Sequence, residues 1–179
     1  MAGGRATEPY PYPVPRSLGA RGAFVSPGTY AVTLQAGDAR ATETVRVVAD
    51  PLLPLTVAQH KEREAFQLEM ADMLAELVTM SQQLAARRRD LTAQRDAAPG
   101  SPAGAAAATN LTNLTQLERT FVASVGQAQG RIMQLYNSFN GSGAQQGSLY
   151  PPTAAMKAQA RDLRGIVDRL KREMAVGSR

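Results

Sequence analysis

Residues 66–91, FQLEMADMLAELVTMSQQLAARRRDL, decide the fold of this chain. Their apolar side chains recur at steps of four and three residues, and the series is Phe66, Met70, Met73, Leu77, Met80, Leu84 and Leu91. Only Arg87 interrupts it. This spacing places one apolar stripe along a helix, and the stripe needs partner helices to cover it.

Two later stretches have the same rhythm and can supply those partners. The first stripe is Leu114, Leu117, Phe121, Val125, Ala128, Ile132, Leu135 and Phe139, and the second is Met156, Ala160, Leu163, Val167, Leu170 and Met174. We expect helices over about 57–97, 110–139 and 153–175, bounded by Pro and Gly residues. Helices joined by short or moderate loops pack as neighbours. The sequence therefore predicts a mainly α fold, an antiparallel three-helix coiled bundle.

Capping residues and small residues mark the ends of the expected helices. Thr56 can cap the first helix and Thr109 or Asn110 the second, which leaves residues 103–108 as a small-residue loop. The first two helices are longer than the third. We therefore expect their far end to project as a two-helix arm that carries this loop.

The segment that precedes the helices has the alternation of a β-hairpin. Apolar and polar residues alternate on both sides of the Gly-Asp pair at 37–38, which suits a tight turn with Gly first. With that turn, Tyr30 faces Val45 and Val32 faces Glu43. The resulting apolar face consists of Tyr30, Val32, Leu34 and Val45, with Val47 beside them.

Two strands alone are marginal in water, so the apolar face needs a cover. The candidates are the helices, the N-terminal Pro-rich arm, or strands that this chain does not contain. Leu52, Leu53 and Leu55 form an apolar hinge that we expect to pack the hairpin onto the first helix. The expected organisation is an extended Pro/Gly-rich arm over 1–23, a β-hairpin over 24–51, and the bundle over 52–179.

Two features could bind partners. Tyr10 and Tyr12 alternate with prolines, which keep the N-terminal arm extended. We interpret this arm as a linker, as an edge strand or as a ligand for an aromatic groove. Arg87, Arg88 and Arg89 are the densest basic run in a chain of net charge +5. They form either a solvated helix face or a strip that binds nucleic-acid phosphates.

Reactive chemistry has few candidates. The absence of Cys excludes disulfides, thiolate metal sites and a cysteine nucleophile. His60 is the single histidine, and with Glu64 it forms an isolated i,i+4 pair, which we interpret as a surface pair. Glu69, Asp72 and Glu76 share no apolar pocket that could raise a pKa. We therefore expect no catalytic site, no cofactor and no metal.

The sequence says little about the compartment. No apolar run approaches about 18 residues, so we expect no membrane-spanning helix. Residues 1–5, MAGGR, lack the apolar core of a signal peptide. We expect either a cytoplasmic protein or a piece of a longer one.

The order of motifs resembles the C-terminal region of bacterial proteins with a sortilin-like or sialidase-like β-propeller, which are often labelled glycosyl hydrolases. The resemblance covers residues 24–174 and is carried by PGTYAVTL at 27–34, VVADP at 47–51, the long helix, and PPT at 151–153 before a Leu-containing helix. In that family a fibronectin-like or immunoglobulin-like sandwich and a helical tail follow the propeller, so the resemblance implies that the hairpin over 24–51 is the remnant of a β-sandwich. The blades have no counterpart here, so the resemblance transfers no catalytic residue. It implies an exported parent protein.

Three functional hypotheses follow. The first is a non-enzymatic structural module that braces or oligomerises a larger exported propeller protein through its helices. The second is a fragment of a sialidase-like glycoside hydrolase whose catalytic propeller is absent from this chain. The third is a basic helical nucleic-acid binder.

Overall fold

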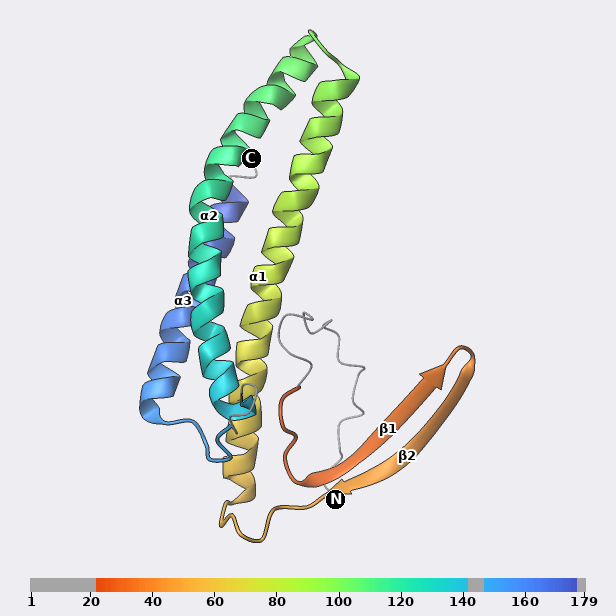
Figure 1. Ribbon diagram of the computed structural model, residues 1–179, viewed down its shortest axis with the longest axis vertical. Helices are drawn as coiled ribbons and strands as arrows, with labels where there is room; N and C mark the ends of the chain where they lie inside the picture. The colour runs from red at the N-terminus through yellow and green to blue at the C-terminus, as the bar shows by residue number, and fades with distance from the viewer. Residues whose placement is uncertain (1–21, 142–146, 177–179) are drawn as a thin grey trace. The chain divides into compact units, whose positions relative to one another are not determined.

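A computed structural model describes residues 22–141 and 147–176 of the chain. It contains an antiparallel β-hairpin followed by three helices (Figure 1). The elements are β1 (Gly28–Ala36), β2 (Ala39–Val47), α1 (Val57–Ala97), α2 (Pro102–Asn140) and α3 (Ala154–Val176). The mainly helical fold with an N-terminal hairpin, predicted from the sequence, is confirmed.

The chain forms two compact units. Among the described residues, one unit holds those up to Glu69 together with those within Asn137–Thr153, and the other holds Met70–Tyr136 together with those from Ala154 onward. The hairpin therefore belongs to the first unit, with the start of α1 and the end of α2. The second unit contains α3 and the greater part of α1 and α2.

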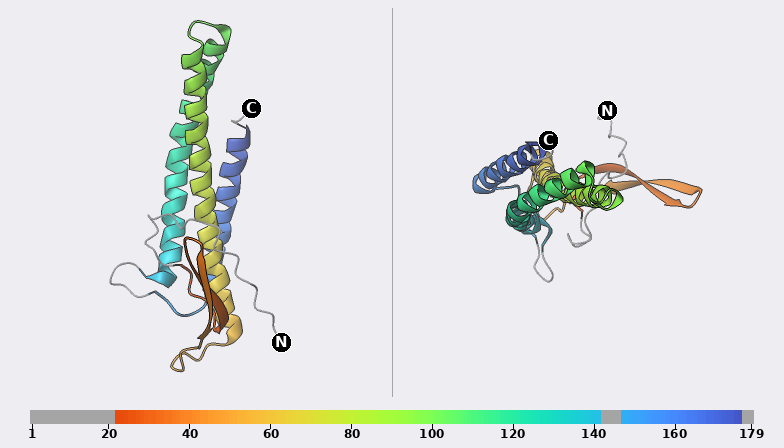
Figure 2. Two further views of the ribbon diagram at one scale, coloured as in Figure 1. Left: turned by 90° about the vertical axis from the view of Figure 1, so that its right-hand side faces the viewer. Right: turned by 90° about the horizontal axis from the view of Figure 1, so that it is seen from above.

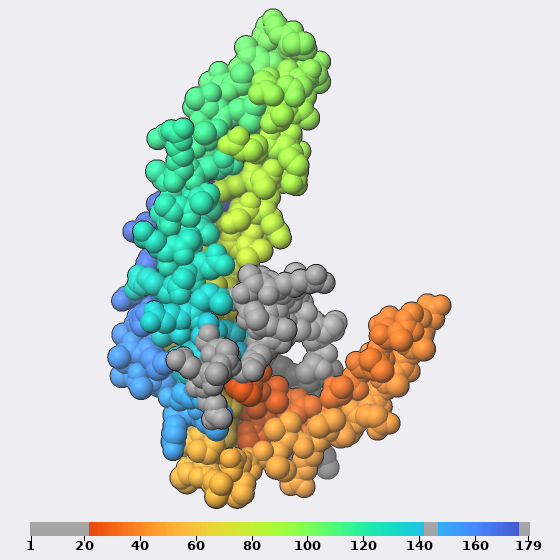
Figure 3. All heavy atoms as spheres, in the orientation of Figure 1, coloured from red at the N-terminus to blue at the C-terminus, as the bar shows by residue number. Residues whose placement is uncertain are grey.

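The core of the second unit is built from the predicted stripes. In this unit α1 and α2 are antiparallel, and the shorter α3 lies beside them (Figure 2). Its buried apolar side chains include Met73, Leu77 and Met80 from α1, Phe121, Val125 and Ile132 from α2, and Leu163, Val167 and Leu170 from α3. Beyond the end of α3, α1 and α2 continue together as the expected two-helix arm, and their atoms stay in contact up to the connecting loop (Figure 3).

The start of α1 agrees with the prediction that Thr56 caps it. The backbone N–H of Gln59 donates to Thr56 Oγ1 at 3.3 Å, and the backbone N–H of Thr56 donates to Gln59 Oε1 at 2.8 Å. This is a reciprocal capping box, which satisfies two backbone donors at once.

The start of α2 differs from the prediction. The helix begins at Pro102, so residues 103–108 are helical and neither Thr109 nor Asn110 is its cap. Ser101 caps it instead, because its Oγ accepts the backbone N–H of Gly104 at 3.1 Å. Proline suits the first helical position, and the alanines that follow have the highest helix propensity. Small residues here allow close helix packing and do not form a loop.

The other helix ends lie close to their expected positions. α2 ends at Asn140, and Gly141 adopts a φ of 75°, the left-handed conformation that ends helices. The N–H of Gly141 donates to the carbonyl oxygen of Asn137 at 2.8 Å. α3 begins and ends one residue later than predicted.

The hairpin has the predicted register. Tyr30 is paired with Val45, and Val32 with Glu43. Gly37 has a φ of 60° while Asp38 does not have a positive φ, so the turn is of the type that places glycine first. The register therefore puts the apolar residues of both strands on one face.

Candidate interaction site

The apolar face of the hairpin is open in the structure. Val32 is 54% exposed, Leu34 71% and Val45 45%. Within the residues that the structure describes, the sheet has two strands and nothing pairs with either outer edge. The parts of α1 and α2 that share a unit with the hairpin therefore do not bury this face. The Pro-rich arm with Tyr10 and Tyr12, another candidate cover within the chain, lies outside the described residues.

The opposite face of the hairpin is polar. The hydroxyls of Thr33 and Thr42 are 2.9 Å apart and share a hydrogen bond across the strands. The register also places Thr29, Thr44 and Arg46 on this face. Polar side chains of this kind are stable in contact with water, whereas the exposure of the apolar face to water is unfavourable. The hairpin therefore has one face suited to solvent and one face suited to packing against another layer, as in a sheet that covers a core.

A short segment before β1, residues 22–26, fixes the base of the hairpin to the start of α1; we call it the anchor segment. Ser26 donates to Glu64 Oε2 from Oγ at 2.5 Å and from its backbone N–H at 3.1 Å. The backbone N–H of Phe24 donates to Gln67 Oε1 at 3.2 Å. The predicted hinge is wrong in part, because Leu52 is 86% exposed and cannot pack the hairpin onto α1.

Gln67 extends this network to the end of α2. Its Nε2 donates to Asn140 Oδ1, and Asn140 Nδ2 donates to the carbonyl oxygen of Gly22 at 3.2 Å. Both side chains are buried. Nearby in the same unit, the rings of Phe66 and Phe139 meet edge to face with centroids 5.5 Å apart. Three segments distant in sequence are thus joined by polar and aromatic contacts, which fix the base of the hairpin to the start of α1 and the end of α2.

Arg63 strengthens the same region. Its guanidinium lies 5.6 Å from the ring centroid of Phe24, and its Nη1 donates to the carbonyl oxygen of Leu149 at 3.0 Å. Burial lowers the pKa of Arg63, and the neighbouring Glu64 carboxylate partly offsets this effect. The arginine therefore holds the anchor segment from one side and residue 149 from the other.

The interpretation of His60 as part of a surface pair is wrong. His60 is buried, and neither of its ring nitrogens has a hydrogen-bond partner; Arg63 Nε is likewise buried without one. Glu64, its expected i,i+4 partner, instead accepts the hydrogen bonds of Ser26. Because the imidazole bonds to no carboxylate, the geometry offers no acid–base pair at this position.

The arginine run on the two-helix arm is partly engaged within the arm. Arg88 Nε donates to Glu118 Oε1 at 3.1 Å, its Nη2 donates to Thr115 Oγ1 at 3.1 Å, and the same nitrogen forms an ion pair with Glu118 Oε2. Arg87 is half-buried, and Arg89 is exposed. The central charge therefore links α1 to α2, which weakens the case for a continuous phosphate-binding strip.

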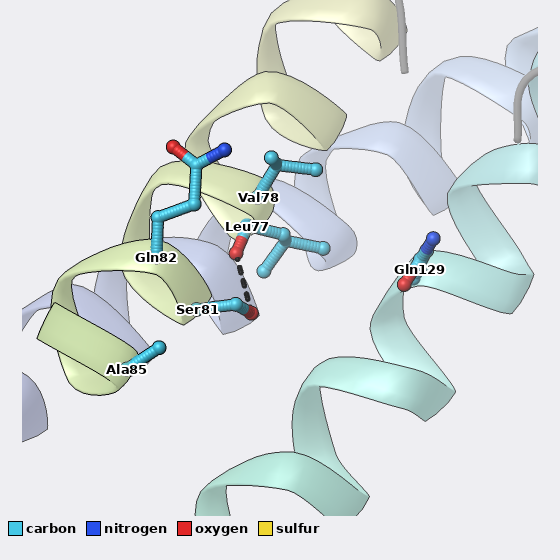
Figure 4. A pocket seen from close by; sticks show the side chains of 6 residues that line it. All are labelled: Leu77, Val78, Ser81, Gln82, Ala85 and Gln129. Carbon is cyan, nitrogen blue, oxygen red and sulfur yellow. Dashed lines mark hydrogen bonds between the residues drawn. The ribbon is translucent and has the colours of Figure 1, made fainter. Parts of the chain in front are cut away.

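One hollow on the second unit could hold a small group. It has a volume of about 260 Å³ and lies between α1 and α2, lined by Leu77, Val78, Ser81, Gln82, Ala85 and Gln129 (Figure 4). The hydroxyl of Ser81 donates to the carbonyl oxygen of Leu77 at 3.0 Å and is thereby used within the helix. None of the lining side chains is titratable. The hollow consequently has no group suited to proton transfer.

The described parts of the chain also lack two further features. They contain no cluster of three or more His, Asp or Glu side chains that could hold a metal ion. No helix among them is both long and apolar enough to cross a membrane.

Comparison with known proteins gives no relative. No protein-family model matches the chain, and neither a curated protein nor a solved structure was found to be similar to it. The resemblance to propeller proteins stays a prediction from the sequence.

Proposed function

We propose that this chain is a non-enzymatic interaction module, the C-terminal part of a larger exported β-propeller protein. In this proposal the apolar face of the hairpin completes a β-sandwich whose other strands belong to the parent protein. The observation that carries it is the open apolar face of a hairpin with a fixed base, since Val32, Leu34 and Val45 are all exposed. A two-stranded ribbon with one apolar face gains stability when a second sheet covers that face.

The anchor segment supports the same proposal. Ser26 and Phe24 are bound to side chains at the start of α1, which therefore fixes the direction in which the hairpin leaves it. A fixed base lowers the entropic cost of docking, because less of the hairpin has to become ordered. The helices then act as a brace that presents the hairpin to the rest of the parent protein.

The experiment begins with the genomic DNA upstream of the Met1 codon. An in-frame region that encodes β-rich domains is expressed as a separate polypeptide and mixed with this chain, and binding is measured by calorimetry. We expect binding by the unmodified chain. Either the absence of an in-frame region or a failure of the two polypeptides to bind contradicts the proposal.

Matched variants locate the contact. Replacement of Val32, Leu34 and Val45 by Ser removes the apolar face, and we expect it to weaken binding at least about tenfold, because each buried side chain of this size contributes about 1.5–3 kcal/mol. The control replaces Thr29 and Thr44 by Ser on the polar face and leaves affinity unchanged. Equal losses in both variants would show that the face does not mediate docking.

A further inference from the structure

The two edges of the hairpin differ in charge. β1 has the sequence GTYAVTLQA, without a charged residue or a proline, whereas β2, ARATETVRV, contains Arg40, Glu43 and Arg46. Natural proteins protect free sheet edges with charges or proline, because an unprotected edge pairs with other strands. β2 has this protection and β1 does not.

The turn determines which backbone groups of β1 face outward. In a hairpin with a two-residue turn, the flanking residues, here Ala36 and Ala39, form a hydrogen-bonded pair, and bonded and non-bonded pairs alternate from there. By this alternation the N–H and C=O groups that point away from β2 belong to Thr29, Ala31, Thr33 and Gln35. No other strand uses them within residues 22–141 and 147–176.

We infer that β1 is an open pairing edge that joins β1 of a second copy of this chain, antiparallel, with Val32 on the two-fold axis. This register overlaps all nine residues of each strand. It places Ala31 opposite Thr33 of the second copy, so the outward backbone groups of both strands meet. The product is a four-stranded sheet in which both copies present their apolar faces on the same side.

The side chains agree with this register. Tyr30 lies opposite Leu34 of the second copy, and the two copies of Val32 meet at the axis. Aromatic and β-branched side chains that lie opposite other apolar side chains across strands stabilise a sheet. No charged side chain lies in the new ladder, because β1 contains none.

The same antiparallel pairing between two β2 strands is unfavourable. Full overlap of two β2 strands places Glu43 opposite Glu43 and Arg40 opposite Arg46 of the second copy. Like charges directly opposite one another destabilise a sheet. Charge therefore selects β1 as the edge that pairs.

The inference goes beyond the proposed function, and this chain alone tests it. Since the chain has no Cys, Val32→Cys introduces a single thiol. At a non-bonded pair on the axis the two Cα atoms would lie about 4.5 Å apart, within the range that a disulfide spans. We expect mild oxidation to yield a covalent dimer of twice 19.0 kDa.

The control is Glu43→Cys, which lies directly across the hairpin from Val32 and is also exposed. In the inferred dimer the two copies of residue 43 are separated by the two β1 strands, so this variant stays monomeric under the same oxidation. Equal rates of cross-linking for the two variants would indicate random collision and would overturn the inference.

Light scattering of the unmodified chain provides a measurement without cross-links. We expect the mean mass to rise above 19.0 kDa with concentration. Val32→Lys places two ammonium groups at the axis and should keep the chain monomeric, whereas Thr42→Lys on β2 should not. A mass that stays at 19.0 kDa up to about millimolar concentration, where affinities of about −4 kcal/mol become visible, also overturns the inference. If the upstream polypeptide does not bind this chain, the proposed function is contradicted, but the expected cross-linking and mass of this chain do not change.

Discussion

Ser26 and Glu64 are joined twice through one carboxylate oxygen, by the Ser26 hydroxyl at 2.5 Å and by its backbone N–H at 3.1 Å. Tyr30 adds a third contact, since its hydroxyl donates to the carbonyl oxygen of Ser26 at 2.5 Å. Burial raises the pKa of Tyr30, and the Glu64 carboxylate raises it further. The phenol therefore reports on the anchor segment.

Glu64→Gln should lower the pKa of Tyr30 toward its ordinary value of 10.0, while the effect of burial remains. In the unmodified chain the raised pKa means that the folded state holds the proton more tightly than the unfolded state. This contribution to stability is complete below pH 10.0 and is lost as the pH rises through the folded pKa. An NMR titration of the Tyr30 ring measures the pKa. Glu43→Gln is the control, and an unchanged Tyr30 pKa in the Glu64 variant would contradict the contact.

Gly104→Ala and Gly130→Ala, both in α2, should change stability in opposite directions. A Cβ at Gly104 would lie 2.1 Å from the carbonyl oxygen of Ala98, whereas one at Gly130 meets nothing within 4 Å. Alanine in an open helix position stabilises by about 0.5–1 kcal/mol. We expect this gain for Gly130→Ala and a net loss for Gly104→Ala, both measured by urea unfolding. A gain in both would mean that the α1–α2 connection is looser than described.

That connection also shows where sequence patterns are ambiguous. A run of alanines after Ser101-Pro102 fits both a small-residue loop and a capped helix, because alanine adds no apolar stripe that periodicity could detect. The Ser-Pro pair was the available signal for the helix start. The apolar stripes of α1, α2 and α3 were unambiguous, and the hairpin register was predictable since a two-residue turn fixes it.

The anchor segment could not be predicted in the same way. Ser26 contacts Glu64 over 38 residues of sequence, and Phe24 contacts Gln67 over 43. Single polar contacts of this kind have no periodicity. Glu64 has a neighbour at i−4, His60, which suggested a local pair; the fold instead buries the imidazole and gives the carboxylate to Ser26.

His60→Leu and Gln67→Leu form a second pair with contrasting outcomes. Both replace a buried polar side chain, but the ring nitrogens of His60 have no hydrogen-bond partner, whereas the Gln67 amide bonds to Asn140 and to the N–H of Phe24. Removal of a buried polar group without a partner removes the free-energy penalty of its desolvation. Breaking a satisfied network instead costs about 1–3 kcal/mol for each group left unpaired. We expect His60→Leu to keep or raise the free energy of unfolding, and Gln67→Leu to lower it.

Chemical denaturation followed by circular dichroism measures both variants. A loss of more than about 1 kcal/mol in His60→Leu would show that the imidazole has a partner in solution, since that is the usual contribution of a hydrogen bond. Exchange of the Phe24 amide hydrogen provides a local readout. It should accelerate in Gln67→Leu and stay unchanged in His60→Leu.

Glu76 makes the second unit sensitive to acid. Burial opposes its ionisation, but hydrogen bonds from Lys171 at 2.9 Å and Arg164 at 2.6 Å, with the charges of both, outweigh burial and lower its pKa from 4.5. A carboxyl group with a lowered folded pKa contributes stability above pH 4.5, and this contribution is lost as the pH falls through the folded value. Burial raises the pKa of the nearby Asp72, which acts in the opposite sense.

Glu76→Gln should therefore lower the free energy of unfolding by up to about 1 kcal/mol near neutral pH, because partly exposed ion pairs are screened by solvent. When the pH lies below the pKa of Glu76 in both the folded and the unfolded chain, the carboxyl is neutral in both. The variant and the unmodified chain should then be equally stable. Urea titrations at about pH 7 and at a series of lower pH values measure how the difference disappears. Glu173→Gln, at an exposed pair with Arg169 at 3.9 Å, is the control and should have little effect at either pH. A Glu76→Gln deficit that persists in acid would mean that packing, and not charge, explains the residue.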